Sequence, residues 1–148
     1  MEPGDMFLGE FTHTIDGKGR LTVPAKFRAA LSLGMVVTRG LDRCLFVFPT
    51  AQWERRSNAI AKMPLTQRDA RAFSRFVFSG AMDVAPDKQG RVLLPAYLRE
   101  YAGIDGDAII IGLHDHLEIW NPDRWREVKL EAEENMELIA EKLGDLEI

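Results

Sequence analysis

The chain has 148 residues and contains an internal repeat, which constrains the fold more than any other feature. A shift of 71 residues aligns six identical positions within a stretch of thirteen: Asp16, Gly19, Arg20, Pro24, Ala25 and Arg28 match Asp87, Gly90, Arg91, Pro95, Ala96 and Arg99. After an insertion of one residue, Gly40, Leu41, Leu45 and Trp53 match Gly112, Leu113, Leu117 and Trp125. Two copies are too few for a solenoid, so the repeat predicts two similar units related by a pseudo-twofold axis.

Each copy shows the pattern of a strand, a tight turn, a strand, a short helix, two strands and a longer helix, which is an α+β arrangement. In the first copy, Phe11, His13 and Ile15 alternate with polar residues before the turn, and Leu21 and Val23 resume the alternation after it. This alternation predicts a half-buried hairpin formed by the two strands that flank the turn.

Glycine and proline occupy informative positions in and after the turns. Gly17 and Gly19 are expected to supply the positive φ of a tight turn, whereas the second copy keeps only Gly90, which leaves its turn free to differ. Pro24 and its counterpart Pro95 both suit the first turn of a helix, where the missing N–H costs nothing. We therefore expect a short helix after each proline.

The other elements follow from composition and capping signals. Four segments rich in β-branched and aromatic residues predict strands: 35–38, 45–48, 108–111 and 117–120. Thr50 is a candidate N-cap for the longer helix of the first copy, and Asn121-Pro122 begins a single amphipathic helix at the end of the chain. The expected organisation is a first repeat over residues 6–63, a connecting helix over 64–75 and a second repeat over 76–148.

Charge is distributed unevenly along the chain. The net formal charge is −4, but residues 1–74 hold 11 Lys and Arg against 7 Asp and Glu, whereas residues 75–148 hold 8 against 16. The first half is therefore suited to a phosphate-rich partner, whereas the acidic side chains of residues 127–147 have the spacing of the solvated face of a helix. No apolar run approaches the roughly 20 residues of a membrane span and no segment reads as a signal peptide, so we expect a cytoplasmic protein without a membrane partner.

The repeated turn carries the chemistry. Lys18 and Arg20 lie two residues apart, so on a strand their side chains project to one face. A protruding β element with two cations fits the major groove of DNA, where arginine reads guanine and lysine holds phosphate. Lys26 and Arg28 on the following helix are candidates for further phosphate contacts.

A structural role for the same residues is an open alternative. A single basic turn is more often a solvated surface feature, and repetition alone is also compatible with a purely architectural role. Asp16 lies four residues before Arg20 across the turn. Pairing of the two side chains, which would pin the hairpin, is therefore as well supported as a DNA contact by Arg20. In that case Lys18 and Lys88 hold the DNA-binding role less ambiguously than the two arginines.

Three segments, 6–10 (Met-Phe-Leu-Gly-Glu), 16–24 and 87–95, make the chain resemble the MraZ family, and the similarity covers nearly the whole chain. The resemblance implies two AbrB-like swapped-hairpin β-barrel halves with flanking helices, assembled into ring-shaped homo-oligomers, octameric or larger. It also implies a transcriptional regulator in the nucleoid, which binds double-stranded DNA at short direct repeats in the promoter of the division and cell-wall gene cluster. Residues 1–5 precede the usual start of the family, so either Met6 is the native initiator or the extension is genuine.

The resemblance also assigns roles by position. Lys18 and Arg20 become the main DNA contacts, with Lys88 and Arg91 contributing less. The residues expected to shape the hairpins are Asp16, Gly19, Asp87 and Gly90. Since the second copy lacks the equivalents of Gly17 and Lys18, we expect the first hairpin to dominate DNA contact and the second to serve the fold or subunit packing.

Enzyme and metal hypotheses compete with this interpretation. Asp16 and Asp87, one from each copy, would form a proton-sharing carboxylate dyad, but each precedes an arginine that keeps it ionised. His13, His114 and His116 lack the spacing of a metal site and suit exposed loops. We therefore expect no enzyme activity, small-molecule substrate, metal or cofactor.

An AbrB-type antitoxin or a protein-binding assembly module is the alternative function. Such antitoxins usually add a toxin-binding tail to a single copy of the repeat. This chain has two copies and an amphipathic end, which favours the regulator.

Overall fold

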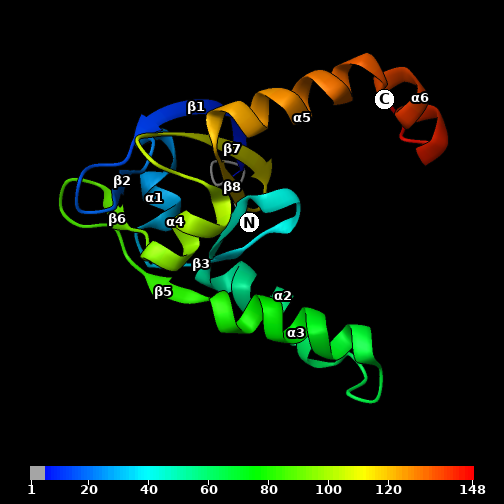
Figure 1. Cartoon of the computed structure of the whole chain (residues 1–148), viewed down its shortest axis with the longest axis horizontal. Helices are drawn as coiled ribbons and strands as arrows, with labels where there is room; N and C mark the ends of the chain where they lie inside the picture. Colours follow the sequence, from blue (N-terminus) through cyan, green and yellow to red (C-terminus); the bar gives the residue numbers. More distant parts are fainter. Residues whose placement is uncertain (1–5) are drawn as a thin grey trace.

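The computed structural model describes residues 6–148 (Figure 1). Its strands are β1 (Phe7–Thr14), β2 (Arg20–Thr22), β3 (Met35–Arg39), β4 (Leu45–Pro49), β5 (Met82–Val84), β6 (Arg91–Leu93), β7 (Asp107–His114) and β8 (Leu117–Trp120). Its helices are α1 (Arg28–Leu31), α2 (Thr50–Ala61), α3 (Arg68–Gly80), α4 (Ala96–Ala102), α5 (Pro122–Glu134) and α6 (Met136–Leu143), with 3-10 turns at Ala25–Phe27 and Leu41–Arg43. The strands form a six-stranded antiparallel sheet in the order β1-β7-β8-β4-β3-β5 and a two-stranded sheet of β2 and β6. The predicted α+β class is confirmed.

Each repeat donates a strand to the other. β1 of the first repeat pairs along its whole length with β7 of the second, from Phe7 opposite His114 to Thr14 opposite Asp107. β5 of the second repeat pairs with β3 of the first in the equivalent way. The exchange is reciprocal, which agrees with the swapped arrangement that the family resemblance implies.

The pseudo-twofold axis passes through two strand pairs. Leu21 lies opposite Val92 in the small sheet, and Phe46 lies opposite Glu118 in the large one. The members of each pair occupy equivalent positions in the two copies, at offsets of 71 and 72 residues. An antiparallel pair of equivalent strands has a local twofold axis at its centre, so the repeat seen in sequence is also a symmetry of the fold.

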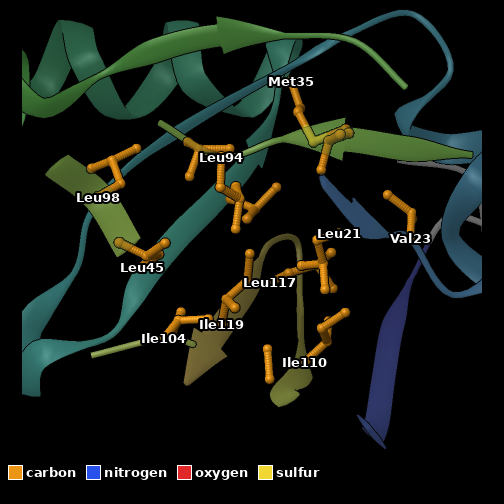
Figure 2. Packing of buried hydrophobic residues seen from close by; sticks show 14 of the residues in the cluster. Leu21, Val23, Met35, Leu45, Leu94, Leu98, Ile104, Ile110, Leu117 and Ile119 are labelled. Carbon is orange, nitrogen blue, oxygen red and sulfur yellow. The ribbon is translucent and has the colours of Figure 1, made fainter. Parts of the chain in front are cut away.

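One hydrophobic core joins the two repeats. Figure 2 shows buried side chains of both copies converging on it, among them Leu21, Met35 and Leu45 of the first and Leu94, Leu98 and Ile119 of the second. Leu45, Leu94 and Leu98 are completely inaccessible to solvent. Neither repeat therefore has a complete core of its own.

The pairing of the strands beside the first turn differs from the sequence prediction. The alternation predicts a hairpin of β1 with β2, and this pairing is wrong, because β1 pairs with β7 and β2 with β6. A single bridge, Ile15 to Leu21, links the two sides of the turn among the described residues. Alternation determines which face of a strand is buried, but it carries no information about which strand lies beside it.

Two predicted helix starts also differ. The segment after Pro24 forms a 3-10 turn and one turn of α1 instead of a regular helix, whereas α4 after Pro95 is regular. Thr50 is the first residue of α2 and not its N-cap. Pro49 takes the cap position with extended backbone (ψ 149°), so the chain turns from β4 into the helix one residue earlier than predicted.

The last helix is broken, although its start is as predicted. Asn121 caps α5 by accepting a hydrogen bond from the N–H of Arg124 at 2.9 Å, and Pro122 follows it. The single helix expected from there ends at Asn135, which separates α5 from α6. Asn135 leaves helical geometry (φ −112°, ψ 9°), and its side-chain amide donates to the carbonyl of Glu131 at 2.8 Å.

Two helical arms leave the body on the side opposite the two turns (Figure 1). The basic arm, residues 50–80, contains α2 and α3; the connecting helix expected over 64–75 is α3, which begins at Arg68 and continues to Gly80. The acidic arm, residues 122–148, contains α5 and α6. No helix among residues 6–148 is both long enough and apolar enough to cross a membrane.

Candidate nucleic-acid interface

Each turn is pinned by its own aspartate and arginine. Asp16 Oδ1 accepts hydrogen bonds from the backbone N–H groups of Lys18 and Arg20, both at 2.9 Å, and Oδ2 accepts from Arg20 Nε at 2.7 Å. Asp87 accepts the three equivalent bonds in the second turn, at 2.9, 3.0 and 3.0 Å. The Asp–Arg pair, which the sequence left as an open alternative, is present in both copies, through Nε and the backbone rather than through two guanidinium nitrogens.

One glycine in each turn is required by the backbone. Gly19 and Gly90 have φ values of +83° and +77°, and their N–H groups donate to the aspartate carbonyls at 3.0 and 2.9 Å. Gly17 does not have a positive φ, so the prediction that it supplies one is wrong. Its replacement by Lys88 in the second copy therefore leaves the turn geometry unchanged.

The pinned carboxylates are held in the ionised form. The backbone N–H of Arg20 keeps the pKa of Asp16 below its usual range, helped by the guanidinium of the same residue, and Arg91 has the same effect on the pKa of Asp87. Each carboxylate accepts hydrogen bonds from its own turn, and within residues 6–148 no hydrogen bond joins Asp16 to Asp87, so the two do not form the proton-sharing pair of the enzyme hypothesis. The described residues also contain no group of three or more His, Cys, Asp and Glu side chains placed to hold a metal ion.

The two turns lie at opposite ends of one outward face, which β2 and β6 form: the Gly19 carbonyl accepts from the N–H of Leu94 at 2.9 Å, and the Gly90 carbonyl accepts from the N–H of Val23 at 2.8 Å. Arg20 lies opposite Leu93, and Thr22 lies opposite Arg91. Opposed residues and residues two apart along a strand share a face, so these four side chains point outward while Leu21 points into the core. Strand geometry places the Cα atoms of the two arginines about 7 Å apart along the strands and about 5 Å apart across them.

Arginines that follow β2 and β6 cross to the opposite turn. Arg99 of the second repeat lies against the first turn, since a Cβ on Gly19 would lie 3.0 Å from Arg99 Cζ. Arg28 of the first repeat lies against the second turn, where a Cβ on Gly90 would lie 2.8 Å from Arg28 Cζ. Each guanidinium is anchored because its Nε donates to a backbone carbonyl, of Val23 for Arg28 at 3.1 Å and of Leu94 for Arg99 at 3.0 Å.

This crossing changes the composition of each basic surface. The sequence places Arg28 beside the first hairpin, and that placement is wrong because the side chain lies at the second. Arg99 was not among the predicted site residues, yet it completes the first surface. The signal that could have found it is the repeat itself, in which Arg99 is the counterpart of Arg28.

Exposed lysines complete the interface. Lys18 and Lys88 are exposed on the two turns, and Lys26 is exposed on the 3-10 turn after Pro24. Their ammonium groups form none of the ion pairs found within residues 6–148. Each turn thus presents one lysine and two arginines, the second arginine coming from the other repeat.

The fold and this surface define a class: α+β proteins in which two repeats exchange strands and present paired basic turns on one face. The MraZ protein family, whose description also likens it to antitoxins, matches residues 6–76 and again residues 77–145. The chain is 49% identical over 141 residues to "Transcriptional regulator MraZ" of Roseiflexus castenholzii, covering 95% of this chain and 99% of that protein. It is 50% identical over 143 residues to the protein of the same name from Desulfitobacterium hafniense strain Y51, covering 97% and 100%. The chain therefore belongs to the MraZ family, as its motifs predicted.

Proposed function

We propose that this protein is a DNA-binding transcriptional regulator whose paired basic turns enter the major groove. The observation that carries the proposal is the outward face of β2 and β6, where hydrogen bonds anchor two arginines at each turn and an exposed lysine lies beside them. A two-stranded β element is one of the shapes that the major groove admits. The name transcriptional regulator, which the relatives carry, supports the same role.

The proposed contacts divide by side chain. Lys18 and Lys88 at the tips of the turns hold phosphate. Arg20 and Arg91 use Nε to pin the turns, which leaves their terminal Nη groups for guanine O6 and N7. The remaining cations, Lys26, Arg28 and Arg99, add phosphate contacts at the edges of the surface.

The proposed target is a set of short direct repeats in the promoter of the division and cell-wall gene cluster, bound in the cytoplasm at the nucleoid. A chain of net charge −4 binds phosphate weakly on its own. Assembly into a ring, octameric or larger, compensates because linked copies engage repeated sites at a high effective concentration. The proposed repeats are residues 6–63 and 76–148, joined by 64–75.

Lysine substitutions test the interface most cleanly, because Arg20→Ala would also unpin the turn. We expect Lys18→Ala with Lys88→Ala to weaken promoter binding about tenfold or more and to lower the log–log salt slope by about 2, the value for two phosphate contacts. Lys142→Ala on the acidic arm is the matched control and should bind within about twofold of the wild type. Fluorescence anisotropy at several salt concentrations gives both quantities, and an unchanged slope in the double variant would refute the assignment.

Two comparisons address the finer points of the proposal. If the first turn dominates, Lys18→Ala weakens binding more than Lys88→Ala, and equal losses would contradict that asymmetry. Reducing the promoter to one repeat should lower the affinity steeply, whereas a flat response would contradict multivalent binding. A purely protein-binding role would be indicated if the wild type had no measurable affinity for either the promoter or unrelated DNA, whereas equal affinity for both would indicate non-specific DNA binding.

A further inference from the structure

An exposed leucine lies on the basic face, the surface formed by the outward side chains of β2 and β6. Leu93 is 56% exposed, whereas its neighbours along the chain, Val92 and Leu94, are buried. Alternation along β6 directs Leu93 to the side of the strands that carries Arg20 and Arg91. Single exposed leucines are common on protein surfaces, so the informative observation is its place among these arginines.

The strand register places Leu93 beside Arg20, because the two residues lie directly opposite each other. The next pair along the ladder is hydrogen-bonded, since the N–H of Leu94 donates to the Gly19 carbonyl at 2.9 Å. Hydrogen-bonded and non-hydrogen-bonded pairs alternate in an antiparallel ladder, so Arg20 and Leu93 form a non-hydrogen-bonded pair with Cα atoms about 4.5 Å apart. Their side chains therefore reach adjacent parts of a ligand bound to the face.

Thr22 occupies the position of the first repeat that is equivalent to Leu93. It lies opposite Arg91, just as Leu93 lies opposite Arg20. Both side chains carry methyl groups, but threonine adds a hydroxyl that donates and accepts hydrogen bonds. Each end of the basic face therefore presents an arginine beside a methyl-bearing side chain, and the end with Leu93 is wholly apolar at that position.

The composition of the basic face selects its ligand. A second copy of the same face is disfavoured, because it would bring Arg20 and Arg91 against two further arginines. A ligand with anionic edges and an apolar group between them fits this face. The major groove of DNA has this arrangement wherever it contains thymine, because phosphates border the groove and the 5-methyl group of thymine projects into it.

We propose that Leu93 packs against the 5-methyl group of a thymine in the DNA site. The inference rests on the proposed DNA-binding function and assigns one base contact within it. If Arg20 reads a guanine, Leu93 reaches the neighbouring base pair, since the separation of about 4.5 Å between the two Cα atoms is close to the rise of about 3.4 Å per base pair. The two ends of the face then differ in specificity, because the hydroxyl of Thr22 also bonds to polar base edges.

Deoxyuridine tests the contact, because it lacks only the 5-methyl group of thymine. Each thymine of a single-repeat promoter duplex, on both strands, is replaced in turn, and fluorescence anisotropy at one salt concentration gives the Kd. For the wild type we expect at least one position at which the replacement raises the Kd about fourfold, the effect of losing one buried methyl group. Leu93→Ala should bind the thymine duplex more weakly than the wild type and should no longer distinguish it from the uridine duplex.

Two control variants separate the methyl contact from a general loss of affinity. Leu93→Met keeps an apolar side chain of similar volume and should keep the preference for thymine. Leu41→Ala removes an equally exposed leucine (55%) that lies outside β2 and β6, and it should bind both duplexes as the wild type does. Circular dichroism checks that each variant is folded.

The outcomes distinguish this inference from the proposed function. If the wild type prefers the promoter to unrelated DNA but tolerates uridine at every thymine, the methyl contact is refuted and DNA binding stands. The same conclusion follows if Leu93→Ala keeps the wild-type preference for thymine. A wild type without any preference for the promoter would refute both proposals.

Discussion

Substitution of Gly90 by alanine tests the crossed packing of the turns. The residue has φ +77°, and a Cβ there would lie 2.8 Å from Arg28 Cζ. Left-handed backbone costs a residue with a Cβ about 1–2 kcal/mol, and displacing Arg28 breaks its hydrogen bond to the Val23 carbonyl, worth about 0.5–1.5 kcal/mol. We expect the free energy of unfolding to fall by about 2–3 kcal/mol, measured by urea denaturation at one fixed protein concentration.

Two other glycines separate the contributions. Gly106 has φ +85° with open space around it, so Gly106→Ala reports the backbone strain alone. Gly17 has neither a positive φ nor a neighbour within 4 Å, so Gly17→Ala should change stability by less than about 0.5 kcal/mol. In an Arg28→Ala background, Gly90→Ala should cost no more than Gly106→Ala. If the two glycine substitutions are already equal in the wild-type background, the crossed position of Arg28 is refuted.

Two further predictions concern buried titratable groups. Burial opposes ionisation of Asp115, but hydrogen bonds and charge from His116 and Arg56 outweigh it and lower its pKa to about 2, below the usual 3.8. The carboxylate therefore stabilises the fold by up to about 2 kcal/mol above pH 4, and this contribution is lost as the pH falls toward 2. In Asp115→Asn, the free energy of unfolding measured in urea should depend less on pH over that range. The same pH dependence as in the wild type would contradict a stabilising role of the Asp115 carboxylate. Burial also raises the pKa of the Cys44 thiol, so a thiol reagent at pH 8 should modify it only after unfolding, and rapid labelling of the native protein would exclude this environment.

Local chemistry was predictable from the sequence. An aspartate four residues before an arginine across a turn indicated the Asp16–Arg20 pair as one of two alternatives, and an amide followed by proline predicted the cap at Asn121. Both features depend on residues close in sequence, whose possible contacts are few. The repeat also predicted the pseudo-twofold relation, because two copies of one pattern bury equivalent faces.

Partner choice between distant segments was not predictable. The alternation in β1 fits pairing with β2 as well as it fits pairing with β7, because both partners would bury the same face. The same uncertainty placed Arg28 beside the wrong turn, since its neighbour depends on the exchange of strands between repeats. The positive φ predicted for Gly17 was wrong for a different reason: when a turn contains two glycines, the sequence does not show which of them adopts positive φ.

In the proposed binding mode, the sequence difference between the two turns gives the molecule a direction on DNA. A homodimer of identical repeats would read a palindrome, because its twofold axis imposes the same contacts on both half-sites. Here the tips differ, with Gly17-Lys18 in one turn and Lys88-Gln89 in the other, so the axis is approximate and the site of one copy need not be palindromic. In the proposed ring, heterologous contacts would make all copies face the same way and match direct repeats, whereas isologous pairs would match inverted ones. Wild-type protein should therefore prefer two direct repeats over the same two sequences inverted at equal spacing, and equal affinity for both arrangements would contradict a directional assembly.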